Sequence, residues 1–389
     1  MTRIGFFITG SREWIAGLNY LKNLLIGISS LESKTIQPVV LIKKDQKDII
    51  PMFEPYGEIL PYSVNRYSLS RLVKRVANKT PMFNFDILDG NGLFIKRNRI
   101  DVMAYSGIFL GRRSFKVVNW VPDFQHLHMP EMFSPDEIIE RNVGFRDTIQ
   151  HSDAVIVSSH DALEDFTRFS PQSLHKAWVL PFVAQIDPLV YEMDSIDELQ
   201  KKYHFMGKYF FLPNQLWKHK NHMVVFKAVK YLKERGADVL VICTGHLNDY
   251  RHKNYKKEIS SFIAKNKLES NIRLLGLVDY SDVIRLFRHS ISVLNPSLFE
   301  GWSTSVEEAK SMGKGMIVSD IRVHREQDPP GSVFFNPNNH IELAEIMMNA
   351  WKSSDGGPDF VLEENARKAI AGRTREFGVS FQNIINMVL

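Results

Sequence analysis

The sequence predicts an α/β protein made of two doubly wound domains. Three observations lead to this prediction. The chain has 389 residues, a usual length for two domains. Short apolar runs alternate with amphipathic helical segments along most of the chain, which is typical of parallel sheets with helices on both faces. The alternation starts again near Tyr209, after a stretch at 187–199 that contains a proline and several acidic residues.

In the first half, the expected strands are short apolar runs, and the expected helices show apolar residues at helical spacing. We predict strands at 3–10, 38–43, 85–90, 100–107, 116–121, 154–159 and 176–184. We predict helices at 17–31 and 68–78, the second of them basic and amphipathic.

The second half repeats this order. We predict strands at 209–214, 237–245, 271–276, 290–297 and 315–320. We predict helices at 221–236, from about 255, at 282–290 and at 306–312. Two series of this size predict a first domain over residues 1–190 and a second over 191–372.

Composition excludes several classes of protein. Hydrophobic residues make up 44% and charged residues 24%, as in globular proteins. No apolar stretch is long enough to span a bilayer, and the apolar run at the N-terminus is too short for a secretory signal. Cys243 is the single cysteine, which excludes an intrachain disulfide and a cysteine-rich metal site. We therefore expect a reduced, cytoplasmic setting.

The positive charge is concentrated in residues 66–116, which contain eleven basic and three acidic residues, a net charge of +8. This stretch is either a solvated basic face or a surface for anionic lipid head groups. Nucleic acid is not expected, because the basic residues are not interleaved with aromatic ones. The basic members are Arg66, Arg71, Lys74, Arg75, Lys79, Lys96, Arg97, Arg99, Arg112, Arg113 and Lys116.

Polar loops follow several predicted strands, and ligands of open α/β sheets bind beyond the carboxyl ends of the strands. Gly10 and Gly17 flank the first such loop. The loop at 119–134 offers Asp123, Gln125, His126, His128 and Glu131. Its two histidines are either ordinary loop residues or metal ligands, and a lone H-x-H pattern is weak evidence for a metal. The loop at 212–226 places Asn214, Lys218 and Lys220 just before a helix. The N-terminal end of a helix dipole is positive and disfavours cations, so an anion between the lysines and the helix start would explain their position.

The loop after the strand at 290–297 carries two carboxylates, Glu300 and Glu308, around three consecutive hydroxyl residues at 303–305. Thr304 with Glu307, and Ser305 with Glu308, match the capping-box pattern at a helix start. Neither match explains Glu300. Free helix N–H groups and hydroxyls favour an anion, and carboxylates accept hydrogen bonds from sugar hydroxyls. A nucleoside diphosphate sugar has both features.

This segment resembles retaining glycosyltransferases of the GT-B architecture, and most closely glycosyltransferase family four. The E-x7-E signature runs from Glu300 to Glu308, preceded by NPSLF and followed by AKSMGKGMIVSD. The family pattern P-S-x-x-E-G-F-G covers the same place. The closing sequence RTREFGVSFQNIINMVL resembles the family's last helix, which returns to the first domain. The resemblance covers essentially the whole chain and implies that the C-terminal helix, about 373–389, completes the first domain beside a central cleft.

The resemblance implies a role for each candidate residue. Glu300 would hold hydroxyls of the donor sugar and Glu308 those of the ribose. Lys220, or Lys218 beside it, would neutralise the leaving diphosphate. The remaining donor-binding candidates are Gly17 in the first domain, Asn214, backbone near Gly276 and Leu277 for the base, and the backbone of Gly301, Trp302, Ser303 and Thr304 for the diphosphate. Asp123, His126 or His128 would face the substrate, with Asp123 and His126 favoured.

The chain departs from the family pattern at four places. The first loop has Ala16-Gly17 where the family usually has two glycines, and Ser303 replaces the second glycine of E-G-F-G. Asn214 stands where an arginine is common, about six residues before the lysine. The family's first-domain histidine would align nearer Pro122 than His126, so His126 is assigned by proximity alone.

The expected function is a retaining hexosyltransferase that works without a metal or other cofactor. The donor is a GDP- or UDP-linked sugar, with mannose as the working choice because QLWKHKNH resembles bacterial polysaccharide mannosyltransferases. The acceptor is a glycan or a polyprenyl-linked sugar at the cytoplasmic face of the cell membrane. Two alternatives stay open: a GT-B sugar-nucleotide epimerase or hydrolase, and a catalytically silent GT-B subunit that binds a partner enzyme.

Overall fold

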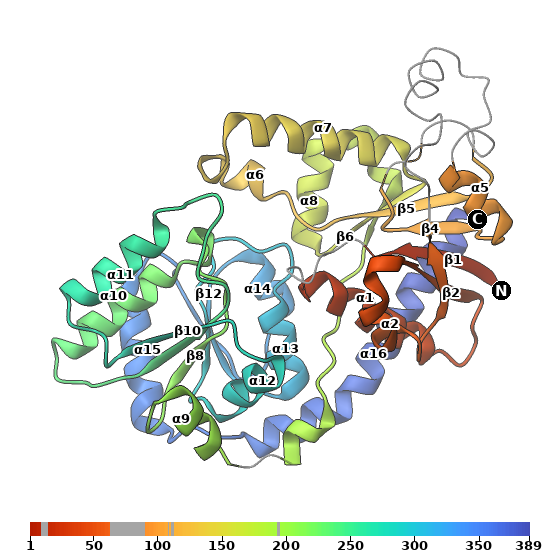
Figure 1. The fold of residues 1–389 in the computed structure, drawn as a ribbon. Helices are drawn as coiled ribbons and strands as arrows, with labels where there is room; N and C mark the ends of the chain where they lie inside the picture. Colours follow the sequence, from red (N-terminus) through yellow and green to blue (C-terminus); the bar gives the residue numbers. More distant parts are fainter. Residues whose placement is uncertain (9–14, 63–89, 108, 110–112, 193–194) are drawn as a thin grey trace. The chain divides into compact units, whose positions relative to one another are not determined.

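A computed structural model describes residues 1–389 except 9–14, 63–89, 108, 110–112 and 193–194 (Figure 1). The chain folds into two compact units. The first domain comprises residues 1–124, 135–183 and 372–389, and the second comprises residues 125–134 and 184–371. No helix among the described residues is long and apolar enough to cross a bilayer.

The first domain is built on a parallel sheet of seven strands in the order β3-β2-β1-β4-β5-β6-β7. The order reverses between β1 and β4, which makes the sheet doubly wound. The strands are β1 (Thr2–Phe7), β2 (Ile36–Lys43), β3 (Glu58–Tyr62), β4 (Val102–Ala104), β5 (Lys116–Val121), β6 (Ala154–Val157) and β7 (Ala177–Val179).

Helices and short 3-10 turns connect these strands. The α-helices are α1 (Ile15–Ser29), α2 (Ile50–Phe53), α5 (Gly90–Arg97), α7 (Pro135–His151) and α8 (His160–Phe169), and the 3-10 helices are η1 (Lys44–Ile49) and η3 (Pro171–Lys176). The long helix α16 (Phe360–Val388) begins in the second domain and ends in the first. Gly27 of α1 and Gly378 of α16 let the two helices touch, since a Cβ on Gly378 would lie 2.2 Å from the carbonyl oxygen of Gly27.

The second domain contains a parallel sheet of six strands in the order β10-β9-β8-β11-β12-β13. The order reverses between β8 and β11, so this sheet is doubly wound as well. Its strands are β8 (Phe210–Leu212), β9 (Val241–Thr244), β10 (Ile272–Gly276), β11 (Val293–Asn295), β12 (Met316–Ser319) and β13 (Val333–Phe335).

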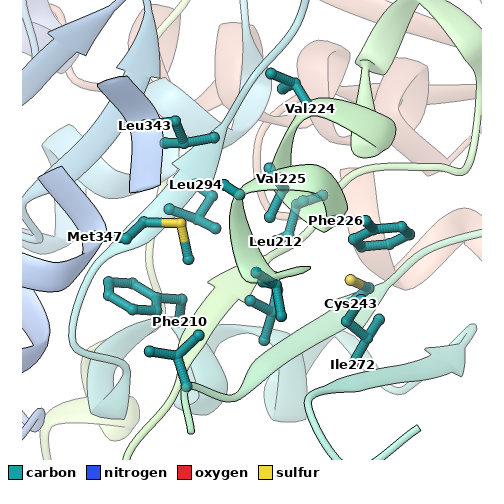
Figure 2. Close-up of a cluster of buried hydrophobic side chains, with 14 of the residues drawn as sticks. Phe210, Leu212, Val224, Val225, Phe226, Cys243, Ile272, Leu294, Leu343 and Met347 are labelled. Atoms are coloured by element: carbon teal, nitrogen blue, oxygen red, sulfur yellow. The ribbon is translucent and has the colours of Figure 1, made fainter. Parts of the chain in front are cut away.

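Helices cover both faces of the second sheet and enclose two cores. Residues of α10, α11 and α15 bury one face, and Figure 2 shows part of that core, with Phe210, Phe226 and Met347 in it. Residues of α9, α12 and α13 bury the other face. The helices are α6 (Gln125–His128), α9 (Asp197–Tyr203), α10 (His222–Lys233), α11 (Tyr255–Lys265), α12 (Tyr280–His289), α13 (Thr304–Met312), α14 (Arg322–Gln327) and α15 (His340–Ser353), with 3-10 helices η2 (Pro130–Met132), η4 (Pro188–Glu192) and η5 (Lys218–Lys220).

The predicted fold class is confirmed, and most predicted strands form where the apolar runs lie. The runs at 116–121 and 315–320 correspond to β5 and β12. Strands β3 and β13 were not predicted, because both are short strands at sheet edges with few buried residues. The strand predicted at 85–90 and the helix predicted at 68–78 fall on residues outside the described part, apart from Gly90, which begins α5.

Candidate active site

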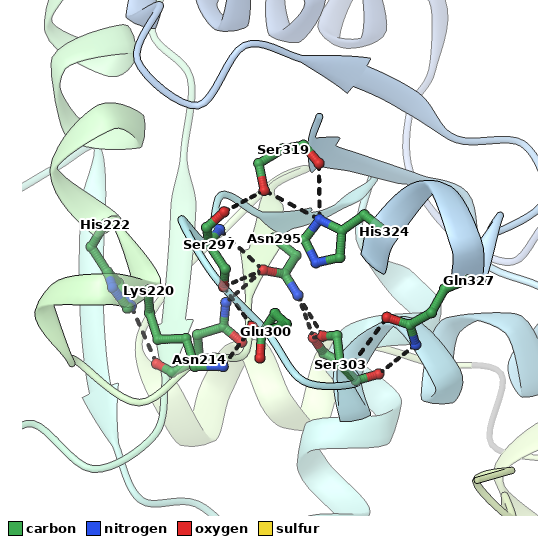
Figure 3. A network of polar contacts seen from close by, with 11 residues as sticks. Asn214, Lys220, His222, Asn295, Ser297, Glu300, Ser303, Ser319, His324 and Gln327 are labelled. Atoms are coloured by element: carbon green, nitrogen blue, oxygen red, sulfur yellow. Dashed lines mark hydrogen bonds and ion pairs between the residues drawn. The ribbon is translucent and has the colours of Figure 1, made fainter. Parts of the chain in front are cut away.

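The predicted polar residues of the second domain gather beyond the carboxyl ends of β8, β11 and β12 (Figure 3). This edge lies at the reversal of strand order between β8 and β11, where doubly wound sheets bind their ligands. The chain leaves β8 into the loop that carries Lys220, leaves β11 into the loop that carries Glu300, and leaves β12 at Ser319 just before α14.

Lys220 and Glu300 form an ion pair at this edge. The Nζ atom of Lys220 lies 2.6 Å from Oε1 of Glu300, and the two side chains are 17% and 9% exposed. Burial alone would raise the pKa of the Glu300 carboxyl, but the charge of Lys220, together with His324 and hydrogen bonds from Lys220 and Ser297, holds that pKa below its usual range. Glu300 is therefore an ionised carboxylate at neutral pH, and 80 residues of chain separate it from its partner.

Asn295 and Ser297 hold the loop that carries Glu300. The Ser297 hydroxyl lies 2.6 Å from Oε1 of Glu300 and 2.7 Å from Oδ1 of Asn295. The amide nitrogen of Asn295 donates to the hydroxyls of Ser303 and Ser305. The sequence analysis did not single out either residue as functional. The sequence could have indicated them by their position directly at the end of an apolar strand, because polar groups buried there need hydrogen-bond partners in neighbouring loops.

Helix α13 begins at Thr304, within the hydroxyl residues where its start was expected, but its first turn is not capped as predicted. Both proposed capping boxes are wrong, because the N-cap residue is Ser303, and its side chain makes no cap hydrogen bond. The Ser303 hydroxyl instead accepts from Asn295, while Gln327 of α14 accepts from the Ser303 backbone N–H at 3.0 Å and donates to its carbonyl oxygen at 3.0 Å. Of the backbone amides predicted for the diphosphate, that of Ser303 is thus already engaged within the protein.

Glu308 lies one helical turn inside α13 and is buried, with 8% of its surface exposed. The hydroxyl of Tyr280, at the start of α12, donates to Oε1 of Glu308 at 2.9 Å. Burial raises the pKa of Glu308 to about 7, while the hydrogen bond from Tyr280 acts in the opposite direction. Leu277, predicted to lie near the nucleobase, is 72% exposed just after β10. The sequence analysis did not identify Tyr280.

The loop before α10 orients its basic residues through backbone contacts. Asn221 is the N-cap residue of α10, but its side chain makes no cap bond and donates instead to the carbonyl oxygens of Pro296 and Pro337. Asn214 is 7% exposed, and its amide lies 3.3 Å from Oδ1 of Asn295. Lys218 is exposed, and its backbone N–H donates to Asp249. Lys220 is thus the lysine that the loop directs to Glu300.

The two histidines of this loop are buried. His219 is 8% exposed and His222 is fully buried. Burial lowers the pKa of each to about 3, so both rings are neutral at physiological pH. His222 donates through Nε2 to the carbonyl oxygen of Asn214 and so fixes the loop that follows β8. Neither histidine therefore adds charge to the site at neutral pH.

The candidates from the loop at 119–134 divide between the two domains. Asp123 is half-buried after β5, in the first domain. His126 is 1% exposed on α6 and packs against Phe133, and the exposed His128 lies with its ring 5.1 Å from that of Phe299, beside Glu300. Gly17 is the third residue of helix α1. No group of three or more His, Cys, Asp or Glu side chains within the described ranges is arranged to hold a metal ion.

Two doubly wound domains, with a polar site at the carboxyl edge of the second sheet, define the GT-B fold. Residues 195–369, which make up most of the second domain, match the family described as glycosyl transferases group 1. Among proteins of curated function, none matches this chain.

Solved structures similar to this one share the fold at low sequence identity. A glycosyltransferase from Rickettsia africae has 14% identity and a TM-score of 0.63, over 100% of this chain and 97% of that one. Anabaena Alr3699/HepE, solved in complex with UDP and glucose, has 15% identity and a TM-score of 0.63, over 100% and 99%. Sucrose-phosphate synthase from Thermosynechococcus elongatus has 10% identity and a TM-score of 0.65, over 100% and 99%. These likenesses show that the chain shares its fold with these structures.

Proposed function

We propose that this protein is a retaining glycosyltransferase that moves a hexose, with mannose as the first choice, from a nucleoside diphosphate sugar to a glycan or lipid-linked acceptor in cell-surface polysaccharide synthesis. The observation that carries the proposal is the ion pair of Lys220 and Glu300 at the carboxyl edge of the second sheet, with the buried Glu308 in the helix that follows the same loop. The ammonium suits a diphosphate, and the two carboxylates suit the hydroxyls of the sugar and the ribose.

In this proposal the site acts by positioning and by electrostatics. Glu300 would accept hydrogen bonds from hydroxyls of the transferred sugar, and Lys220 would stabilise the charge that develops on the departing diphosphate. The acceptor hydroxyl would attack the anomeric carbon on the face that the diphosphate leaves, and the departing phosphate oxygen would take the hydroxyl proton. Configuration at the anomeric carbon would be kept, and no metal or other cofactor would be needed.

Two features of the proposal concern the partners of the reaction. UDP and glucose occupy the structure of Anabaena Alr3699/HepE, so UDP-linked sugars are tested beside GDP-mannose. The basic stretch at 66–116 supports a peripheral contact with the anionic inner face of the cell membrane, where a polyprenyl-linked acceptor would be present.

The test has two stages. First, UDP, GDP and ADP are screened for an increase in melting temperature, and we expect UDP or GDP to stabilise the protein. Second, the matching nucleotide sugars are incubated with a membrane extract from which this protein is absent, and product configuration is determined by NMR. Transfer that requires the extract and keeps the anomeric configuration is the expected result. Release of free sugar or an epimerised nucleotide sugar without an acceptor would favour a hydrolase or epimerase instead.

A further inference from the structure

His324 is a buried histidine beside the Lys220–Glu300 pair with one ring nitrogen unused. It lies on α14 and is 0% exposed. Its Nδ1 atom lies 2.9 Å from the carbonyl oxygen of Ser319, which can only accept, so Nδ1 carries the hydrogen. Nε2 of the neutral ring then has a free lone pair. It is buried and has no hydrogen-bond partner among the residues that the structure describes.

A short chain of contacts connects this ring to Glu300. The Ser319 hydroxyl donates to the carbonyl oxygen of Ser297 at 2.5 Å, and the Ser297 hydroxyl contacts Glu300 at 2.6 Å. Figure 3 shows the ring of His324 between Ser319 and the cluster of Asn295, Ser297 and Glu300. Nothing in the reaction proposed above uses this buried base.

Two charged groups act on His324 with opposite signs. Burial has the largest effect and lowers the pKa of the ring, the Glu300 carboxylate raises that pKa, and Lys220 lowers it. With all three present, the pKa lies below its ordinary value, so the ring is neutral at neutral pH. Moving Lys220 away from Glu300 would therefore raise the pKa of the ring.

A bound diphosphate would change the position of Lys220. Its ammonium has a single hydrogen-bond partner within the described part of the chain, Glu300. The side chain of Lys220 is also more exposed than that of Glu300. If Lys220 turned to the phosphates, Glu300 would keep the Ser297 hydroxyl as its donor and would be a buried carboxylate without a cation, which is strongly unfavourable.

We propose that His324 is a positioning residue that takes up a proton at Nε2 when the donor diphosphate draws Lys220 away, so that Glu300 keeps a positive neighbour. The inference rests on the proposed function and adds a step to it. The proton comes from the solvent, no covalent bond other than N–H forms, and the Nδ1–H hydrogen bond to Ser319 is kept. Glu300 then remains ionised and correctly placed for the sugar hydroxyls.

The variant His324→Asn separates this role from a structural one. The amide nitrogen of asparagine occupies the place of Nδ1 and can still donate to the carbonyl oxygen of Ser319, but the side chain has no group that takes up a proton. The matched control is His204→Asn. His204 is exposed and has a φ of 53°, in the left-handed region that asparagine tolerates well.

The measurement is the number of protons taken up when UDP or GDP binds, from calorimetry in two buffers of different ionisation enthalpy. At about pH 6.5, near the ordinary pKa of imidazole, the wild type should take up more protons than His324→Asn, by up to about one, since one ring binds one proton. Glu308 and the nucleotide phosphates titrate in both proteins and cancel in the difference. His204→Asn should match the wild type.

The outcomes are separable. Equal proton numbers in the wild type and His324→Asn would overturn the inference and leave the proposed function standing. If neither UDP nor GDP binds the wild type, both fail together. If His324→Asn does not fold, the proton numbers of the wild type and Lys220→Met are compared instead, at a higher nucleotide concentration to offset weaker binding. In this variant no lysine leaves Glu300 when the nucleotide binds. The extra proton uptake should then be absent, and its persistence would overturn the inference.

Discussion

At the scale of single residues, the site is a set of polar groups that satisfy one another across long distances in the sequence. Glu300 pairs with Lys220, which lies in a loop 80 residues earlier, and the backbone of Ser303 is hydrogen-bonded to Gln327, 24 residues later. Each partner is buried or nearly so, which strengthens the contacts and makes each one costly to lose. The effect of a substitution in this site can therefore be predicted from the contact that it removes.

Glu300→Gln should lower turnover strongly while the protein stays folded. Glutamine keeps the size and one acceptor oxygen, but it loses the charge that pairs with Lys220 and that we propose contacts the transferred sugar. Losing one charge-assisted contact in the transition state costs about 2 to 4 kcal/mol, or roughly 30- to 1,000-fold in kcat. Steady-state kinetics with the identified donor gives the value, and circular dichroism checks the fold. Turnover near that of the wild type would remove Glu300 from the site.

Glu308 predicts a pH dependence of donor binding. Burial raises its pKa to about 7, so the carboxyl is largely protonated below pH 7 and ionised above it. If the carboxylate accepts the ribose hydroxyls, its ionisation should increase nucleotide affinity as the pH rises through about 7. The effect is measured in His324→Asn, where proton uptake at His324 does not oppose it. Calorimetric titration between about pH 5.5 and 9, on either side of that pKa, measures the increase.

Tyr280→Phe should shift the pH at which nucleotide affinity increases, because it removes the hydrogen bond to Glu308. The Tyr280 hydroxyl stabilises the ionised form of Glu308, so removing it should raise the pKa of Glu308 further and move the affinity profile to higher pH. Affinity at neutral pH should fall and should recover in more alkaline buffer. A loss of affinity of the same size at every pH would show instead that Tyr280 contacts the nucleotide directly.

At the scale of elements, the packing of α1 against α16 in the first domain depends on two glycines. Gly378→Ala should lower the stability of the protein by about 2 kcal/mol, since an added methyl group would collide with the backbone of Gly27 and force the helices apart. Gly372→Ala, also on α16, is the control. A Cβ there meets no other atom within 4 Å, so the change should be neutral or stabilising by up to about 1 kcal/mol. Thermal unfolding of the two variants distinguishes them.

The elements also show how far the sequence could predict this molecule. Runs such as 154–157 and 210–212 were recognisable as strands because burial on both faces makes them continuously apolar. The short edge strand β13 has little such signal. Helix α13 was found, but its first turn was misread. The capping pattern is local, whereas Ser303 is fixed by Asn295 and Gln327, contacts that depend on the tertiary fold. His324 and Tyr280 were missed for the same reason.

At the scale of the whole molecule, charge is the feature that predicts an interaction. Of the basic residues at 66–116, Arg113 and Lys116 pair with Asp153 in the first domain, while Arg71, Lys74, Arg75 and Lys79 lie outside the described residues. Each Lys or Arg close to an anionic bilayer contributes about 1 kcal/mol. The wild-type protein should therefore sediment with vesicles that contain anionic lipid, and the bound fraction should fall as salt screens the charges.

Two variants with the same change of charge test where that contact lies. The first replaces Arg71, Lys74, Arg75 and Lys79 with Gln, and the second replaces Lys253, Lys256, Lys257 and Lys265, which are exposed in and just before α11 of the second domain. If the first domain meets the membrane, the first variant should bind anionic vesicles weakly at low salt and the second should bind as the wild type does. If both variants lose vesicle binding equally, binding depends on the total charge of the protein and not on the first domain in particular. A wild type that ignores anionic vesicles at low salt would make the basic stretch a solvated surface and favour a soluble acceptor, because the charge that we propose brings the site to a lipid would then have no effect.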